Sequence, residues 1–489
     1  MNGGGTRNRG REEYMKMVAH VVLFPFPAQG HINCMLKLAD LLSTSDLHIT
    51  FLNTHHNHNR LSCFSSAFAR LSLRPHFRFL SIPDGLPDDD PRSATALWDL
   101  DDSLRTRSGD HLRQLLTSCR QDGWPQITCV LVDSVMPFAI EPVVDLGIPA
   151  IIFRTASACS LWAYHCIPKL IETGELPFPD EPDMDEKIQG VAGMESFLRR
   201  RDLPSFCRET GDLASSRALQ MVSRAVENVN RARAIILNTC ESLEGPVLHH
   251  IRSSVCPTIF AIGPLHQLLA RAHQYSKEQQ LSGNLWLEDR TCMAWLDTQP
   301  KGSVVYVSFG SFTVMALDEL LEFWHGLVNS GHPFLWVIRP DLVDGVERSS
   351  TSTELLLEGT IKRGFIIEWA PQEEVLAHPA VGCFLTHSGW NSTLDSVVVG
   401  VPMICWPFFA DQQINSRFVS EVWGIGLDMK DMTGREVVEM MVRRVMEGEE
   451  GKELKQSALV MAELAKRSVQ EDGSSYLQFQ SLLHYINSL

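Results

Sequence analysis

The sequence predicts an α/β protein built from two doubly wound domains, each with a parallel sheet. In the first half, short apolar runs typical of buried strands alternate with longer segments whose apolar residues have helical spacing. Near residues 262–264 this pattern pauses, and a second series of strands and helices follows. Because alternating strands and helices favour a parallel sheet covered on both faces, two successive series indicate two such domains.

The first series contains six apolar runs that we interpret as buried strands. Between them, residues 35–42 and 111–116 show the apolar spacing of helices. The expected strands cover residues 21–24, 48–52, 77–80, 129–132, 150–153 and 234–237.

The second series begins after a polar, poorly periodic segment, 265–284, which we interpret as an interdomain linker. Its expected helices cover 292–296 and 318–328, its expected strands cover 304–308, 334–338 and 382–386, and residues 436–489 are mainly helical with a break at Gly473 and Ser474. The predicted organisation is a disordered N-terminus at 1–17, an N-terminal domain at 18–264, the linker at 265–284, a C-terminal domain at 285–465 and a last helix at 466–489.

Composition and charge favour a globular protein that acts on small molecules. The chain has 489 residues, of which 44% are hydrophobic and 21% are charged, as in ordinary globular proteins. Its formal net charge of −16 argues against nucleic acid or an anionic membrane as the main partner. Residues 1–17 lack the apolar core of a signal peptide, and the longest uncharged run, 17–36, is too polar to span a bilayer. Since the twelve cysteines show no zinc-type spacing either, we expect a soluble, monomeric protein of the reducing cytosol.

Residues 369–412 carry the most distinctive pattern in the chain. Within them, a strand-like apolar run leads into a helix whose first residues include Asn391 and Ser392. Such a helix start presents unpaired backbone N–H groups at the positive end of the helix dipole, which suits a phosphate. Further on, Asp411 and Gln412 offer a carboxylate and an amide for sugar hydroxyls. A diphosphate site beside a site for hydroxyls indicates a nucleotide sugar.

This segment resembles the signature box of plant family 1 UDP-glycosyltransferases over its whole length, without a gap. The resemblance extends over residues 18–489 and implies the GT-B architecture, in which two facing Rossmann-like domains enclose the active site. It also implies that the first domain binds the acceptor and the second binds the UDP-sugar. The last helix would return to the first domain.

The resemblance further implies a role for each residue of the donor site. Asp395 stands where the family usually has Glu as the acceptor for a ribose hydroxyl, so its carboxylate must reach one methylene further. We expect this departure to change donor affinity and not donor class. The implied contacts are Trp369 on uracil, Gln372 on ribose, His387, Asn391 and Ser392 on the diphosphate, and Trp390, Asp411 and Gln412 on the hexose, with Ala370 and Gly389 completing the site.

Two residues in the first domain have the chemistry of a general base and its partner. His31 follows the first strand at its carboxyl end, where open parallel sheets place their ligands. Imidazole is the side chain best suited to take a proton from an alcohol near pH 7. Asp133 ends a later strand and could fix the tautomer of that imidazole. The alternatives are helix capping by either residue, but the catalytic His and the activating Asp of the family match these two positions.

Three more residues are candidates for the walls of the same cleft. Ser311 follows a strand of the second domain in a Phe-Gly-Ser turn and could donate to a phosphate oxygen. Asp84 lies in a Pro-rich turn that, by resemblance, borders the acceptor pocket. Arg154 follows the strand at 150–153, and its guanidinium is either paired with a protein carboxylate such as Glu141 or available to bind a substrate carboxylate.

Other motifs give no further chemistry. The histidines at 55–58 and at 249–250 lack a full ligand set at zinc-type spacing, so we expect no metal site. The chain also lacks the GxGxxG, GxxxxGK[ST] and HExxH motifs.

We therefore interpret the chain as a metal-independent, inverting UDP-glucosyltransferase without a cofactor. We expect it to make a β-glucoside from a hydroxyl or carboxyl of a small plant metabolite, an iridoid or another terpenoid. Two alternatives stay open at this point: a non-catalytic nucleotide-sugar-binding protein, and the same transferase with a phenolic or flavonoid acceptor.

Overall fold

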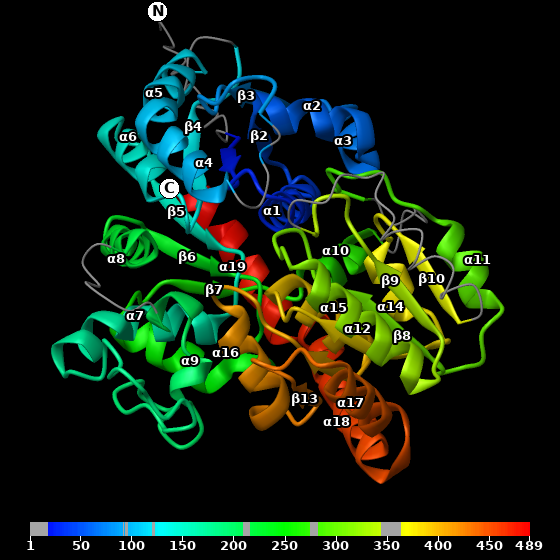
Figure 1. Ribbon diagram of the computed structural model, residues 1–489. Coiled ribbons are helices and arrows are strands. Elements are labelled where there is room, and N and C mark those ends of the chain that lie inside the picture. Colours follow the sequence, from blue (N-terminus) through cyan, green and yellow to red (C-terminus); the bar gives the residue numbers. More distant parts are fainter. Residues whose placement is uncertain are drawn as a thin grey trace, which may run out of the picture.

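Two parallel β-sheets, each covered by helices on both faces, form the framework of the protein (Figure 1). The computed structural model describes residues 18–90, 92, 96–119, 123–208, 216–273, 282–343 and 363–489. The first sheet has seven strands in the order β3-β2-β1-β4-β5-β6-β7, and the second has six in the order β10-β9-β8-β11-β12-β13. The predicted fold class, two doubly wound parallel α/β domains, is confirmed.

The first sheet belongs to the N-terminal half of the chain. Its strands are β1 (His20–Phe24), β2 (His48–Thr54), β3 (Phe77–Ile82), β4 (Ile127–Asp133), β5 (Ala150–Arg154), β6 (Ala234–Leu237) and β7 (Ile259–Ala261). The helices of this half are α1 (Gln29–Leu42), α2 (His55–Phe64), α3 (Ser66–Leu71), α4 (Leu97–Ser103), α5 (Gly109–Ser118), α6 (Ile140–Asp145), α7 (Ala158–Glu172), α8 (Arg217–Val229), α9 (Glu241–Ser254) and α10 (Leu265–His273).

The second sheet belongs to the C-terminal half. Its strands are β8 (Val304–Ser308), β9 (Phe334–Val337), β10 (Gly364–Ile367), β11 (Val381–Thr386), β12 (Met403–Cys405) and β13 (Gly426–Asp428). The helices are α11 (Thr291–Asp297), α12 (Leu317–Ser330), α14 (Gln372–Ala377), α15 (Trp390–Val399), α16 (Gln412–Arg417), α17 (Arg435–Met446), α18 (Gly448–Ser468) and α19 (Ser474–Ser488).

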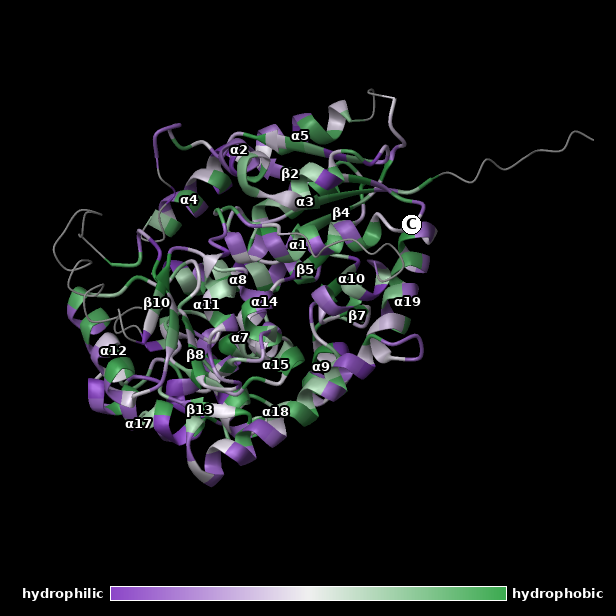
Figure 2. Cartoon of the chain, turned by 90° about the vertical axis from the view of Figure 1, so that its right-hand side faces the viewer, coloured by the Kyte–Doolittle hydropathy of each residue, from purple (hydrophilic) through white to green (hydrophobic). Residues whose placement is uncertain are grey.

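The strands near the middle of each sheet are mostly apolar because helices cover both faces of each sheet. In β1, Val22 and Phe24 enter one hydrophobic cluster, whereas Val21 and Leu23 enter another on the opposite face. The first cluster also contains Val304 of β8, so the two halves share a continuous core. In Figure 2 the strands are mostly green, while the helices alternate green and purple as expected for helices with one buried side.

The last helix, α19, packs against the first sheet although it follows the second in sequence (Figure 1). Its buried residues Phe479, Leu482 and Ile486 belong to the same hydrophobic cluster as Val21 and Leu23 of β1. It begins at Ser474, where the sequence predicts a break in the helical pattern. The domain limits predicted from the sequence stay a prediction.

The structure differs from the sequence-based expectation in several short elements. β7, β12 and β13 have three residues each and were not predicted, because three residues are too few to show a period. β10 was also missed. The segment predicted as an irregular linker begins with α10, which packs on α1 through Leu265 and Leu268. Residues 1–17, predicted to be disordered, and 274–281 of the predicted linker lie outside the described residues.

A buried ion-pair network joins the two halves on the side of α16. Asp202 is fully buried and accepts hydrogen bonds from Nζ of Lys430 at 2.6 Å and from both Nε and Nη2 of Arg199 at 2.9 Å. Arg199 also reaches Asp428 at the end of β13, 3.0 Å away. Since Arg199 and Asp202 come from the first half and Lys430 from the second, these charges hold the segment before α8 against the second sheet.

We expect Asp202→Asn to lower the free energy of unfolding by about 3–5 kcal/mol, because the substitution removes the fully buried carboxylate and leaves the buried Lys430 ammonium only with Asp428, which is 3.4 Å away. Chemical denaturation measures this loss. The matched control is Asp185→Asn, which removes a 59% exposed side chain that also pairs with Arg199, and should change stability by less than about 1 kcal/mol. Equal losses for the two variants would contradict the importance of the buried network.

Candidate active site

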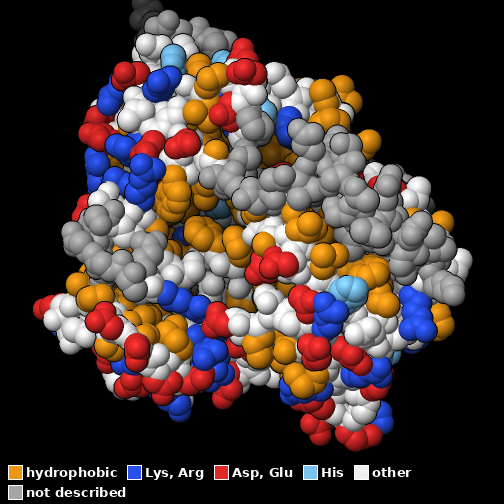
Figure 3. Space-filling model, in the orientation of Figure 1, with side chains coloured by type: hydrophobic (Ala, Val, Ile, Leu, Met, Phe, Trp, Pro, Cys, Tyr) orange, Lys and Arg blue, Asp and Glu red, His pale blue; other side chains and the backbone are white. Residues whose placement is uncertain are grey.

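Each sheet has one point where the strand order reverses, and both points open on the same cavity. In the first sheet this point lies between β1 and β4, and in the second between β8 and β11. Ligands of open α/β sheets bind in the crevice beyond the carboxyl ends of the strands at such points. The cavity has a volume of about 710 Å³ and is lined by residues from both halves. In Figure 3 hydrophobic side chains gather around a hollow between the upper and lower parts of the molecule.

The predicted base and its partner meet at the reversal point of the first sheet. His31 lies in the first turn of α1, after β1, and Asp133 ends β4, the strand beside β1. Nδ1 of His31 is 2.8 Å from Oδ2 of Asp133. The carboxylate is fully buried and accepts backbone N–H groups of Phe26 and Val135, each at 3.2 Å. Its orientation is therefore fixed by the backbone around it.

The contacts of His31 determine which of its ring nitrogens faces the cavity. Because Nδ1 donates to the Asp133 carboxylate, the neutral ring carries its proton there and leaves the lone pair on Nε2. Oγ1 of Thr155 lies 3.0 Å from the same Nδ1 and closes this side of the ring. His31 itself lines the cavity, so Nε2 is the nitrogen available to a ligand.

In the part of the cavity supplied by the second half of the chain, the N-terminus of α15 points at the cavity. Its N-cap is Gly389, which offers no side chain to the first-turn N–H groups. Gly389, Trp390, Asn391 and Ser392 all line the cavity. A ten-residue helix with an uncapped N-terminus provides both N–H donors and the positive end of a dipole, which together favour a phosphate.

His387 lies beside this helix end in a tight environment. A Cβ on either Gly310 or Gly389 would stand 2.4 Å from its Nε2, so both positions require glycine for the ring to fit. Gly310 also has a φ of +71°, a conformation that glycine adopts readily. Burial lowers the pKa of His387 to about 4, so the ring is neutral at pH 7 and acts as a hydrogen-bond partner.

Gln412 and Asp411 stand next to the helix end, at the start of α16. Oε1 of Gln412 accepts the backbone N–H groups of Phe408 and Phe409, both at 2.8 Å. This bonding turns the Nε2 donor of Gln412 toward the cavity that the residue lines. Burial raises the pKa of Asp411, and its carboxylate accepts a hydrogen bond from Nδ2 of Asn415 at 2.8 Å.

The first domain closes the cavity with an apolar wall, formed by Phe26, Leu97, Trp98, Val135, Tyr164 and Phe206. Arg154 lies within this wall and is 5% exposed. None of the described carboxylates forms an ion pair with Arg154, and its predicted role at a substrate carboxylate stays a prediction. Glu141 lines a separate depression of about 360 Å³ instead.

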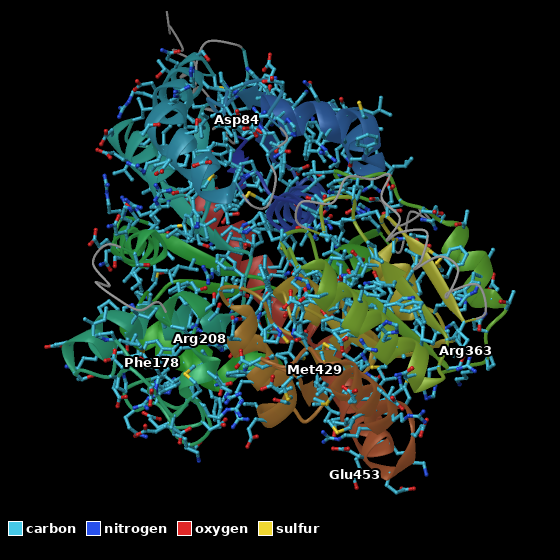
Figure 4. All side chains as sticks on the ribbon, viewed as in Figure 1. Asp84, Phe178, Arg208, Arg363, Met429 and Glu453 are labelled. Atoms are coloured by element: carbon cyan, nitrogen blue, oxygen red, sulfur yellow. The ribbon has the colours of Figure 1, made fainter. Side chains whose placement is uncertain are left out.

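Asp84, predicted to border the acceptor, does not line the cavity. Arg92 donates to both of its oxygens, at 2.9 and 3.2 Å, and the carboxylate is 4% exposed. Figure 4 shows Asp84 in the upper part of the first domain, away from α15 and α16. The role predicted for Asp84 at the acceptor stays a prediction, and the local ion pair with Arg92 is a contact that the sequence pattern does not reveal.

Comparisons with known proteins agree with this geometry. Residues 283–466 match the family described as UDP-glucoronosyl and UDP-glucosyl transferase, and residues 17–147 match the glycosyltransferase N-terminal domain. The chain is 51% identical over 472 residues to myricetin 3-O-rhamnoside 1,2-glucosyltransferase of Crocosmia x crocosmiiflora, covering 96% of each chain. It is 50% identical over 478 residues to 7-deoxyloganetic acid glucosyltransferase of Catharanthus roseus, covering 97% of this chain and 98% of that one.

The chain belongs to the UDP-glycosyltransferase family.

Solved structures of other plant UDP-glycosyltransferases share the whole fold. The complex of UDP-glucose: anthocyanidin 3-O-glucosyltransferase with UDP has a TM-score of 0.81 at 25% identity and covers 97% of this chain and 100% of that one. The complex of Os79 from O. sativa with UDP has a TM-score of 0.79 at 28% identity and covers 95% and 100%. The predicted GT-B fold and glucosyltransferase class are therefore confirmed.

All residues predicted for the donor site line the cavity of this UDP-glycosyltransferase. They are Ser311, Trp369, Ala370, Gln372, His387, Gly389, Trp390, Asn391, Ser392, Asp395, Asp411 and Gln412. Trp369 stacks on Trp286, with ring centroids 5.9 Å apart, at the end of the cavity where uracil is expected. Their individual contacts with a nucleotide sugar stay predictions.

Sequence reasoning missed several contacts of the site. The indole N–H of Trp390 donates to the backbone carbonyl of Asn238 at 2.8 Å, so this side chain joins the two halves and leaves only the backbone N–H for a sugar. Thr155 was also missed, although its position directly after Arg154 at the end of β5 is the kind of signal that marks a site residue.

For the described residues, the structure bears on metal binding and on membrane crossing. Among these residues there is no group of three or more His, Cys, Asp or Glu side chains that could hold a metal ion. No helix in the same part of the chain is long and apolar enough to cross a membrane.

The shortened carboxylate, Asp395, sits in a buried charged cluster of the transferase. Nε2 of Gln372 donates to it at 2.9 Å, and Nδ1 of His266 lies 3.8 Å away. Lys37 of α1 pairs with Glu373 of α14 beside it. Burial, followed by the negative charge of Glu373, raises the pKa of Asp395 to about 7. Ionising Asp395, the carboxylate expected to face the ribose, therefore lowers the stability of the folded protein.

This cost gives a pH-dependent prediction for Asp395→Asn. Because the pKa of Asp395 is higher in the folded than in the unfolded protein, ionising it lowers stability progressively between about pH 4 and pH 7 and fully above. The neutral Asn variant should therefore unfold at a higher temperature than the parent protein at pH 8, with the difference shrinking at pH 5. The control is the exposed Asp46, whose Asn variant should show no such pH-dependent difference. A lower unfolding temperature for Asp395→Asn at pH 8 would refute this account.

Proposed function

We propose that the protein transfers glucose from UDP-glucose, with inversion, to a hydroxyl of a small and largely apolar plant metabolite. The observation that carries this proposal is that the His31–Asp133 pair and the α15 N-terminus, which come from different halves of the chain, meet at one cavity. A base for the acceptor and a site for the leaving diphosphate are thereby brought together. The solved relatives that hold UDP support the donor class.

In the proposed reaction His31 Nε2 takes the proton of the acceptor hydroxyl. The acceptor oxygen forms a bond to the anomeric carbon while the bond from that carbon to the diphosphate oxygen breaks, and UDP leaves with the electron pair. Asp133 holds the Nδ1 proton throughout and stabilises the imidazolium that forms. The proton moves to the base as the new bond forms, so no free alkoxide is required.

The leaving diphosphate gains negative charge as the bond breaks. In this proposal the first-turn N–H groups of α15 and the neutral His387 receive that charge. The proposed mechanism uses no metal, and turnover in excess EDTA tests this point. A cytosolic location and a monomeric state stay predictions from the sequence.

The names of the relatives suggest two acceptor classes. Two relatives are named for 7-deoxyloganetic acid, an iridoid, and two others for 7-deoxyloganetin. This supports an iridoid or related terpenoid as the acceptor of the present chain. The relative named for myricetin 3-O-rhamnoside supports a flavonoid glycoside as the second candidate. Measuring UDP release and product mass with UDP-glucose and both kinds of acceptor separates them.

The remaining alternative is a protein that binds nucleotide sugars without catalysis. Such a protein has no need for a base, whereas here His31 and Asp133 are both present and hydrogen-bonded to each other. Absence of sugar transfer to every acceptor, together with tight UDP-glucose binding, would favour this alternative.

We expect His31→Ala to reduce the turnover of an alcohol acceptor by about 10²–10⁴-fold, because the reaction loses its general base. Binding of UDP, measured by calorimetry, should stay nearly unchanged since the α15 site is intact. Asp133→Asn should also be damaging but less uniformly across acceptors. A turnover close to that of the parent enzyme for His31→Ala with a non-acidic alcohol would reject the mechanism.

We expect the enzyme to prefer UDP-glucose to UDP-galactose through Gln412. Since Oε1 of Gln412 is bound to two backbone N–H groups, only its Nε2 donor is available to a sugar hydroxyl. A mismatched epimer leaves a buried polar group unpaired, which costs roughly 1–3 kcal/mol. Initial rates with the two donors measure this preference, and Gln412→His should reduce it. Equal kcat/KM values for both donors in the parent enzyme would show that Gln412 does not select the sugar.

A further inference from the structure

Arg154 presents a buried positive charge to the acceptor side of the cavity. Its side chain is 5% exposed, and it lines the cavity between apolar residues such as Val135 and Phe206. A guanidinium remains charged at physiological pH, and burying a charge without an anion is strongly unfavourable. A buried arginine in a ligand cavity therefore needs an explanation.

The protein supplies hydrogen-bond partners for only some of the N–H groups of this guanidinium. One Nη1 proton is donated to Oγ of Ser134 at 3.3 Å and one Nη2 proton to Oγ of Ser160 at 3.1 Å, and both partners are neutral hydroxyls. The ring of Tyr164 lies 5.0 Å from Cζ and adds a cation–π contact. The Nε atom is buried and has no hydrogen-bond partner among the described residues. Its partners among the described residues, which also include the hydroxyl of Tyr164, are thus all neutral, and N–H groups of the guanidinium remain for a ligand.

Asp411, a buried carboxylate that lines the same cavity, does not neutralise Arg154 through an ion pair. Asp411 is close enough for the charge of Arg154 to oppose the rise in its pKa, which is caused by burial. Its carboxylate nevertheless forms no ion pair with Arg154 and binds Asn415 instead. Arg154 thus lies between the acceptor wall and the residues expected at the sugar without being neutralised by either.

Arg154 is also tied to the catalytic pair through the backbone. Ser134, which accepts its Nη1 proton, directly follows Asp133, and the next residue after Arg154, Thr155, contacts Nδ1 of His31. Asp133 and Phe153 are register partners on the adjacent strands β4 and β5. The guanidinium and the base are therefore held by neighbouring positions on two paired strands, so one small molecule can reach both.

We propose that Arg154 is a specificity residue that binds a carboxylate of the acceptor, so that the preferred substrates are apolar hydroxy acids glucosylated on the hydroxyl. This inference rests on the proposed function and names its substrate class. A planar carboxylate matches the fork of a guanidinium and neutralises its charge. The apolar wall binds the carbon skeleton, and the hydroxyl lies at Nε2 of His31. The carboxylate is held and is not the attacking group.

The test compares an acid with its methyl ester as acceptors for the full-length enzyme and UDP-glucose. A suitable pair is 7-deoxyloganetic acid and its methyl ester, which have the same reacting hydroxyl. The parent enzyme should show a clearly lower KM for the acid. In Arg154→Leu, kcat/KM for the acid should fall by about 10–100-fold, the range expected for losing a charge-assisted hydrogen bond, mainly through KM. The value for the ester and the KM for UDP-glucose should change by less than about threefold.

Two variants serve as controls. Arg154→Lys keeps the charge without the planar fork and should retain part of the preference for the acid. Arg290→Leu removes another cavity-lining guanidinium, which is paired with Glu374 at the donor end, and should leave the ratio of acid to ester unchanged.

Binding provides a readout that does not depend on turnover or on the stability of the Leu variant. With His31→Ala and UDP, calorimetry should show tighter binding of the acid than of the ester. Equal losses on acid and ester in Arg154→Leu, equal binding of the two by the parent cavity, or a glucosyl ester as the product would overturn the proposal. If the enzyme glucosylates neutral acceptors but neither binds nor prefers acids, this inference fails while the proposed function stands. If no acceptor receives glucose, the proposed function itself fails.

Discussion

The hydrogen bond between His31 and Asp133 is the interaction on which the organisation of the site depends. It exists because β1 and β4 are neighbours in the sheet although more than a hundred residues separate His31 and Asp133 in the sequence. The buried carboxylate is oriented by backbone N–H groups, and it in turn sets the tautomer of the imidazole. The strand order therefore places the lone pair of the His31 imidazole on Nε2. His31 lines the cavity, so this nitrogen is available to a ligand.

The second constraint is that the two halves must keep the base and the expected diphosphate site in a fixed position relative to each other. Direct hydrogen bonds do this at the cavity itself. Nδ2 of Asn391, at the start of α15, donates to the carbonyl of Gly30, the residue before His31, at 3.0 Å. Oγ of Ser157, at the start of α7, donates to Asn415 of α16 at 2.7 Å. With the shared hydrophobic core and the Asp202 network, these contacts make the cleft one structural unit.

The sequence predicted those parts of the protein that depend on local pattern. Strands of four or more apolar residues were mostly found, and His31 and Asp133 were identified because each follows or ends such a strand at the expected edge of the sheet. Contacts between distant segments were not predicted. The indole bond of Trp390 to Asn238 and the contact of Thr155 with His31 join residues more than a hundred positions apart. The pairing of Asp84 with Arg92, eight residues further along the chain, was not predicted either, because only the folded turn brings the two side chains together.

In the proposed mechanism, His31 deprotonates the acceptor oxygen, which attacks the anomeric carbon from the face opposite the diphosphate. The configuration of the first product formed from the α-linked donor UDP-glucose reports directly on this displacement. Proton NMR of the early reaction mixture distinguishes the anomers by the coupling constant of the anomeric proton. We expect a β-glucoside from the first turnovers onward. An α-glucoside as the initial product would contradict direct displacement and with it the assignment of His31 as the base.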